Sequence, residues 1–241
     1  MRLRTFGGLW IEATGAQPPP EPRKRWLALL AILAASGPKG ISRDRLLGIL
    51  WADADEERGR HALSQTLYSL RRELGGEPVV GGTELRLSPL ILTSDVGDAQ
   101  AALAAGDRRK ALSLYGAPFL EGFYLEAAPE FERWVEEQRQ RLNSQMIAAA
   151  EAVAKEATAS GNPAEVSAAW LRLTELDPLR ARFATSYMSA LAAQGDRAGA
   201  LAHARRHEEA VHRELDTAPD PEVVELAKRL RRRCHRAAPR A

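Results

Sequence analysis

The sequence lacks several features that would narrow its class at once. Cysteine occurs only at position 234, so no disulfide can form within the chain, and we expect a reducing, cytoplasmic setting. The N-terminus lacks the long apolar core of a signal peptide. No apolar run approaches the ~18 residues that a membrane span needs. The longest one, at 26–35, predicts a buried helix, and we expect no membrane partner.

The motifs of common enzymes and metal sites are also missing. No GxxxxGK[ST] loop occurs, so ATP hydrolysis is not expected. His203, His207 and His212 gather late in the chain, but HEEAVH is not the HExxH of a metalloprotease. No nucleophilic residue and base stand out as a catalytic pair in the sequence. The sequence therefore predicts a protein that is not an enzyme and that holds neither a metal nor a cofactor.

The formal net charge of +2 hides an uneven distribution. Residues 1–92 carry +3, residues 93–227 carry −8, and residues 228–241 carry +7 without one acidic residue. A basic first part beside an acidic second part indicates that the first part meets a polyanion. The basic end has two interpretations, a disordered solvated end or a nonspecific nucleic-acid arm, and the first is favoured.

The first part has the order of elements of a winged helix. The second and third of its three helices form a helix-turn-helix, and the third is predicted to enter a DNA groove. The predicted elements are a strand pair at 3–12 broken at Gly7-Gly8, a proline-rich linker at 15–22, helices at 23–36, 42–51 (N-capped by Ser42) and 58–74, and a hairpin at 79–88 turned by Gly81-Gly82.

The helix predicted at 58–74 has two chemically opposite faces. Four leucines at steps of four, three and four share one side, and an unusual polar set lies about 200° away at roughly 100° per residue. Imidazole, amide, phenol and guanidinium groups can bond base edges and phosphates. The alternative is an amphipathic core helix with a mixed polar face. The predicted DNA-binding residues are Arg58, Arg60, His61, Ser64, Gln65, Tyr68, Arg71 and Arg72 on this helix, with Arg43 in the second helix and Arg86 in the hairpin.

From about Asp95 the pattern becomes helical and rich in alanine. Gly161 and Gly195 lie 34 residues apart, which is the period of tetratricopeptide repeats. Ala111 and Ala200 each lie five residues after the glycine of a Gly-Asp pair, where close helix packing needs a small side chain. A last helix is predicted at 221–233. We expect a DNA-binding domain over 1–92, a repeat domain over 93–233 and a basic tail over 234–241.

Together these segments resemble the bacterial transcriptional activator family, often called the Streptomyces antibiotic regulatory protein type. The segments that carry the resemblance are LRTFGGLWIE, ISRDRLLGILW, HALSQTLYSLRREL, GGTELRL and the stretch from DPLRARF to DTAPDPEV. The resemblance implies an OmpR-like winged helix joined to an all-helical, tetratricopeptide-type activator domain. It also implies binding to double-stranded DNA as a homodimer and contact with RNA polymerase. The hairpin departs from the family, because Glu84–Leu87 stands where Gly-Tyr-Arg-Leu is usual.

The sequence thus predicts a mainly α protein that regulates transcription, as an activator, by binding specific DNA sequences. The second hypothesis is a tetratricopeptide-type scaffold whose winged helix makes protein contacts. A scaffold would not need Arg58, Arg60, Gln65 and Arg72 on one exposed side of a helix.

Overall fold

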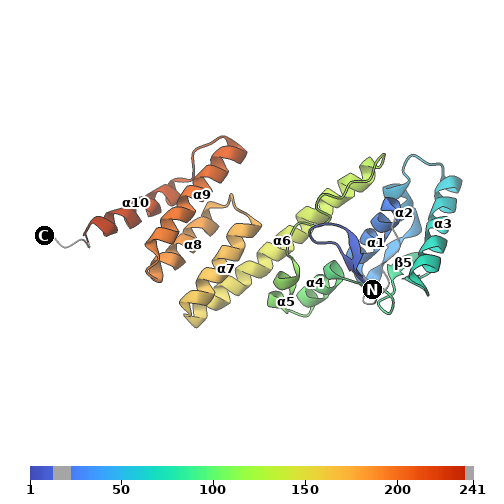
Figure 1. Cartoon of the computed structure of the whole chain (residues 1–241), viewed down its shortest axis with the longest axis horizontal. Coiled ribbons are helices and arrows are strands. Elements are labelled where there is room, and N and C mark those ends of the chain that lie inside the picture. Colours follow the sequence, from blue (N-terminus) through green and yellow to red (C-terminus); the bar gives the residue numbers. More distant parts are fainter. Residues whose placement is uncertain (13–22, 237–241) are drawn as a thin grey trace. The chain divides into compact units, whose positions relative to one another are not determined.

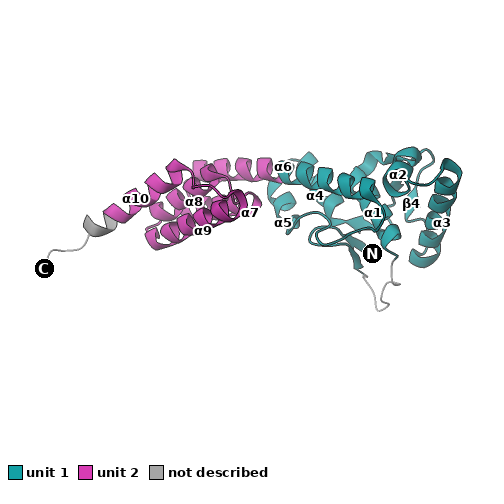
Figure 2. Ribbon diagram, turned by 90° about the horizontal axis from the view of Figure 1, so that it is seen from above, with its two compact units in different colours: residues 1–145 teal, residues 146–241 magenta. Residues whose placement is uncertain are grey.

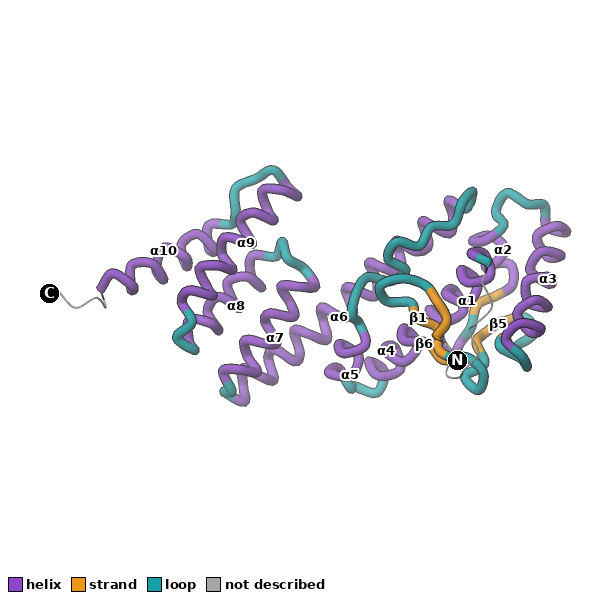
Figure 3. Tube along the Cα trace, in the orientation of Figure 1, coloured by secondary structure: helices purple, strands orange, loops and turns teal. Residues whose placement is uncertain are grey.

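The computed structural model describes residues 1–12 and 23–236, and the linker predicted at 15–22 lies outside them. The described chain is mainly α-helical with two small sheets (Figures 1 and 3). It divides into two compact units, residues 1–145 and 146–241 (Figure 2). This confirms the predicted fold class, a winged helix-turn-helix followed by a helical repeat region. No helix of the described part is long and apolar enough to cross a membrane.

The chain opens with a three-stranded sheet of order β2-β1-β6. The predicted strand pair is confirmed: β1 (Arg2–Arg4) and β2 (Trp10–Glu12) are antiparallel. Gly7 and Gly8, with φ of 78° and 141°, make the turn in a region that favours glycine. The third strand, β6 (Thr93–Ser94), lies parallel to β1 and was not predicted.

The winged helix follows, and its three predicted helices and its hairpin are confirmed. Helix α1 is buried on all sides over Trp26–Ala35, as its uninterrupted apolar sequence requires. A short third strand and a 3₁₀ turn between α1 and α2 were not predicted. The elements are α1 (Lys24–Ser36), η1 (Gly37–Lys39), β3 (Ile41–Ser42), α2 (Arg43–Leu50), α3 (Glu56–Leu74), β4 (Val79–Val80) and β5 (Glu84–Leu87), with the strands in the order β3-β5-β4.

A non-helical segment interrupts the helical region that was predicted from Asp95 onward. Helices α4 (Asp95–Ala104) and α5 (Arg108–Leu114) precede it, and the 32-residue α6 (Pro129–Ser160) follows it. The prediction that this region is helical apart from its Gly-Asp and Gly-Asn breaks is therefore wrong for residues 115–128.

The reason is that this segment pairs with the start of the chain. The Leu120 amide donates to the Thr5 carbonyl at 2.8 Å, and the Gly7 amide donates to the Pro118 carbonyl at 3.0 Å. Phe119, which forms a β-bridge with Phe6, is fully buried. Backbone groups that are committed to strand-like pairing cannot also bond within a helix.

A buried carboxylate fixes β1 against α4. Asp95, only 3% exposed, accepts hydrogen bonds from the amides of Thr5, Phe6 and Val96, and from the Thr5 hydroxyl at 2.6 Å. Thr5 and Phe6, which follow β1, lie about ninety positions before Asp95 in the chain. Asp95 thereby satisfies buried donors that no strand covers.

The second unit is a stack of helices in the predicted repeat. Gly161 and Gly195, with φ of 75° and 87°, occupy the turns before α7 and α9, and Ala200 is fully buried. The basic end is helical as far as Arg236, so the favoured disordered interpretation is wrong up to that residue. The helices are α7 (Pro163–Leu176), α8 (Ala181–Ala193), α9 (Arg197–Leu215) and α10 (Pro221–Arg236).

Candidate nucleic-acid interface

Within the helix-turn-helix, N-terminal caps on α2 and α3 and a close contact between these two helices position α3. The Ser42 hydroxyl accepts from the Arg45 amide at 3.3 Å, which confirms the predicted N-cap of α2. Asp55 caps α3 by accepting from the Arg58 amide at 2.9 Å. Gly59 is buried where α3 approaches α2, and a Cβ on it would lie 3.5 Å from Leu47 Cδ2. The start of α3 is therefore closely defined relative to α2.

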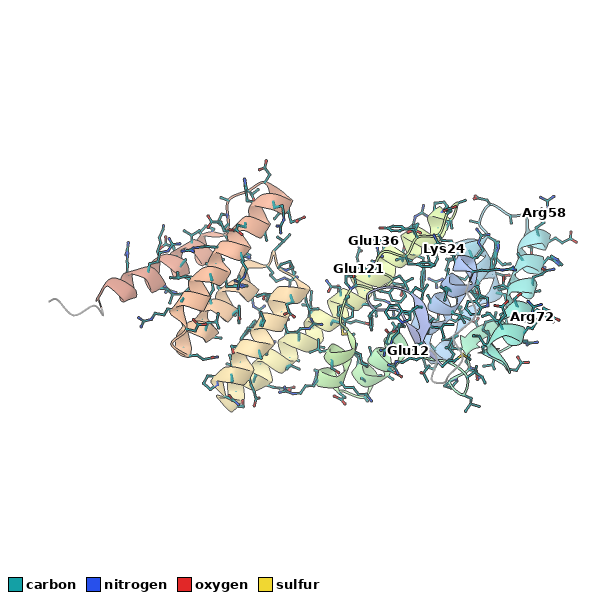
Figure 4. The ribbon with its side chains drawn as sticks, viewed as in Figure 1. Glu12, Lys24, Arg58, Arg72, Glu121 and Glu136 are labelled. Carbon is teal, nitrogen blue, oxygen red and sulfur yellow. The ribbon has the colours of Figure 1, made fainter. Side chains whose placement is uncertain are left out.

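The two predicted faces of α3 are present. Leu63, Leu70 and Leu74 are buried, and Leu67 is half-buried. All eight residues that the sequence assigned to the polar side of α3 are exposed: Arg58, Arg60, His61, Ser64, Gln65, Tyr68, Arg71 and Arg72. Figure 4 labels Arg58 and Arg72, which lie toward opposite ends of α3. Their contact with DNA remains a prediction.

The arginines of α3 are paired with carboxylates. Arg58 Nε lies 3.1 Å from Asp55 Oδ2, Arg60 pairs with Glu56, Arg71 Nη2 lies 2.9 Å from Glu77 Oε2, and Arg72 Nη2 lies 3.6 Å from Glu73 Oε1. Each arginine side chain is more than half exposed, so breaking such a pair costs about 1 kcal/mol or less.

The stretch 55–77 has no excess of positive charge, because it holds four arginines and five acidic residues. Charged residues of both signs occur only near the two ends of this stretch. The predicted phosphate contacts of Arg58 and Arg60 would have to displace carboxylates. Attraction of a polyanion is thus not the main property of this helix.

The centre of the exposed face is polar and uncharged. Gln65 Nε2 lies 3.0 Å from His61 Nε2, and the Ser64 hydroxyl donates to the Arg60 carbonyl at 2.9 Å. Tyr68 is 67% exposed, an unusual position for a large aromatic side chain, and its hydroxyl has no hydrogen-bond partner among the described residues. Amide and imidazole groups can exchange their mutual bond for bonds to base edges.

The wing lies beside α2, and Arg43 connects the two. Arg43 Nε donates to the Gly82 carbonyl at 2.9 Å, and its amide donates to the Thr83 carbonyl at 3.3 Å. The structure therefore gives Arg43 a structural bond to the wing turn, which the sequence did not indicate. Arg86 on β5 is exposed, while its neighbour Leu85 is buried.

Two of the late histidines, His203 and His207, are buried and form a structural cluster. Burial, followed by the charge of Arg206 and the neighbouring His207, lowers the pKa of His203 to about 4. His203 meets the ring of Tyr187 edge-on at 4.8 Å, and His207 Nδ1 lies 2.9 Å from the Pro178 carbonyl oxygen. Over residues 1–12 and 23–236, no group of three or more potential metal ligands comes together.

Comparison with known proteins adds the family. The profile of the family described as "Bacterial transcriptional activator domain" matches residues 93–231, which is more than half of the chain. The chain belongs to the bacterial transcriptional activator domain family. This family consists of transcriptional regulators and is not a class of enzyme. The matched stretch of the bacterial transcriptional activator domain extends from β6 into α10.

Two similar proteins accompany this family assignment. An "Uncharacterized 47.3 kDa protein in thcA 5'region" of Rhodococcus erythropolis is 30% identical over 181 residues, which is 73% of this chain and 39% of that protein. The solved structure of Mycobacterium tuberculosis EmbR in complex with a low affinity phosphopeptide matches with a TM-score of 0.61 and 24% identity, over 96% of this chain and 65% of that one. The second likeness shows a shared fold. The chain spans less than two thirds of either protein.

Proposed function

We propose that this protein is a transcriptional activator that recognises a specific DNA sequence with α3 and the wing. In this proposal residues 1–92 are the DNA-binding domain, and residues 93–233 are the activator domain that contacts RNA polymerase. Membership of the bacterial transcriptional activator domain family supports the regulatory role. The observation that carries the DNA-binding role is the exposed, uncharged polar centre of α3, opposite its buried leucines and beside a wing.

The chemistry of that centre favours base recognition over simple attraction. In helix-turn-helix proteins the N-terminal residues of the second helix meet base edges. His61, Ser64 and Gln65 occupy the first half of α3, and Gln65 can form the paired hydrogen bonds that glutamine makes with adenine. Arg72 in the last turn of α3 would contact guanine or phosphate, and Arg86 on the wing would contact backbone phosphate or the minor groove. The complex would involve a homodimer on two half-sites.

Two observations favour the second hypothesis, a scaffold with a protein-binding winged helix. The four arginines of α3 are all paired with carboxylates, so the helix has little net attraction for a polyanion. An exposed tyrosine within a polar face also suits a protein partner.

The deciding experiment selects duplexes with a random central region on the full-length chain and then measures affinities by gel shift. We expect one enriched motif whose binding weakens as salt rises. Recovery of no motif, together with no salt-sensitive binding, would refute the proposal and favour the scaffold. Transcription with purified RNA polymerase on a promoter that carries the motif would then test activation.

Two substitutions assign the contacts within the motif. Gln65→Ala should weaken binding to the selected motif by about 1–3 kcal/mol and relax selection at one base pair. Arg72→Ala should do the same at another base pair, whereas a uniform loss across sequences would make Arg72 a phosphate contact. Gln140→Ala, an exposed glutamine on α6 that donates to Glu136, is the matched control and should leave binding unchanged.

A further inference from the structure

The last helix, α10, separates apolar and basic residues more sharply than its neighbours. Its apolar side chains Val223, Leu226, Ala227 and Leu230 are buried in one core with residues of α8 and α9. The basic side chains of residues 228–232 are exposed, and at roughly 100° per residue they lie on the sides of the helix away from this core. We call this set the α10 basic cluster; its members are Lys228, Arg229, Arg231 and Arg232.

The α10 basic cluster is short of negative partners. Lys228 Nζ donates to Glu225 Oε1 at 2.8 Å. Arg229, Arg231 and Arg232 form no ion pair with any residue that the structure describes. The hydrogen bond and charge of Lys228, and then the charges of Arg232 and Arg229, lower the pKa of Glu225. Within the described part of α10, two carboxylates, Glu222 and Glu225, thus stand against four cations.

Several other basic side chains of the second unit pair with acids. Arg180 pairs with Asp177 at 2.9 Å, and Arg182 Nη1 lies 3.5 Å from Glu151 Oε1. On α9, the exposed Arg205, Arg206 and Arg213 are matched in number by three exposed glutamates, Glu208, Glu209 and Glu214. The excess on α10 is therefore local, and the remaining sequence to residue 241 adds three arginines and no acid.

The chemistry of α10 fits duplex DNA better than insertion at a lipid surface. A helix that inserts at a membrane surface buries its apolar face in lipid, but the apolar face of α10 is already inside the protein core. The cluster extends over about 6 Å of helix, at 1.5 Å per residue. Duplex DNA presents about three to four phosphate charges over that length, at one per ~1.7 Å of axis.

We propose that the α10 basic cluster binds the phosphate backbone of duplex DNA without regard to sequence. This inference rests on the proposed function. The α10 basic cluster would supply the excess of positive charge that α3 lacks. The cluster provides attraction to DNA, while the polar centre of α3 provides the choice of site. The two roles predict different responses to salt and to sequence, so they can be measured separately.

The experiment compares two full-length triple variants in which three arginines become glutamine. The first changes the cluster (Arg229→Gln, Arg231→Gln, Arg232→Gln), and the control changes α9 (Arg205→Gln, Arg206→Gln, Arg213→Gln). Both lose the same charge from exposed positions, and circular dichroism melts should match those of the original chain. The probe is a labelled 40-base-pair duplex of arbitrary sequence, followed by fluorescence anisotropy between about 50 and 200 mM salt.

We expect the α10 variant to bind roughly 10- to 100-fold more weakly near 0.1 M salt, with a salt slope smaller by about two to three. The α9 variant should stay within about three-fold of the original. Equal losses in both variants, or no loss in either, would overturn the inference. So would an α10 variant that keeps its DNA affinity but loses binding to vesicles rich in anionic lipid.

The two proposals fail in different ways. If the selected motif loses affinity in the α10 variant while discrimination between motif and arbitrary sequence is retained, both proposals hold. If no motif exists but the α10 variant still loses affinity for arbitrary duplex DNA, only the role of α3 fails. If the motif is selected normally and the α10 variant binds it unchanged, only the role of the α10 basic cluster fails.

Discussion

Replacing Asp95 by alanine is the sharpest test of how the first unit is held together. The Asp95 carboxylate is 3% exposed and accepts from the Thr5 amide at 2.9 and 3.0 Å, the Thr5 hydroxyl at 2.6 Å, the Phe6 amide at 3.2 Å and the Val96 amide at 2.8 Å. Alanine would leave these donors buried without an acceptor. The loss of stability should therefore exceed the loss caused by removing any exposed charge on α4.

The magnitude follows from the number and type of these bonds. A hydrogen bond to a charged group contributes about 1.5–3 kcal/mol, and bonds that share one carboxylate are not additive. Removing one partner from a buried charged network typically costs about 3–5 kcal/mol. For a chain of this size, with about 2–4 °C per kcal/mol, the melting temperature of the first unit should fall by about 6–20 °C.

The assay is scanning calorimetry of the full-length chain, with Asp98→Ala as the control. Asp98 also lies on α4, but its carboxylate is 41% exposed and pairs with Arg2 at 2.8 Å. Its loss should cost about 1 kcal/mol or less. Equal melting temperatures for the two variants would refute the claim that Asp95 is the principal link between β1 and α4.

Two further predictions concern the wing and the histidine cluster. Gly81 has φ of +115°, and a Cβ there would lie 1.9 Å from the Glu84 carbonyl oxygen. Gly81→Ala should therefore destabilise the wing by about 1–3 kcal/mol in thermal melts and weaken DNA binding in gel shifts. Gly82→Ala is the control and should change neither, because a Cβ at Gly82 meets nothing within 4 Å. His203 has a folded pKa of about 4, below the ordinary 6.5, so the folded state binds fewer protons. Stability should thus be complete above pH 6.5 and fall by about 3 kcal/mol as the pH drops toward 4. In urea titrations His203→Leu should remove this pH dependence, and an unchanged profile in that variant would assign it to another group.

The sequence was most informative where structure depends on neighbouring residues. The N-cap at Ser42 and the leucine spacing of α3 are local patterns, and both were confirmed because a cap and an amphipathic face involve residues within a few positions. The Gly81-Gly82 turn belongs to the same class, because its φ requirement acts within one hairpin.

Features that depend on distant partners could not be predicted. Strand β6 and the non-helical segment 115–128 exist because they pair with residues near the start of the chain, and no local pattern records that pairing. The bond of Arg43 to the Gly82 carbonyl was missed because it involves a residue 39 positions later, and the contact of Arg43 with DNA stays a prediction. The ion pairs of α3 were also missed, because counting cations on one face leaves out the acids at its ends.

The pairing of β1 with much later residues has a consequence for synthesis of the chain. Thr5 and Phe6 obtain their partners only after Asp95 and then residues 118–120 have been made. At about 5–20 residues per second, Asp95 alone follows Thr5 by roughly 5–18 s. During that interval β1 has only β2 beside it, and an isolated two-stranded hairpin is marginally stable. Strand β1 thus leaves the ribosome well before the residues that secure it, and a fragment that ends at residue 92 would leave it in that state permanently.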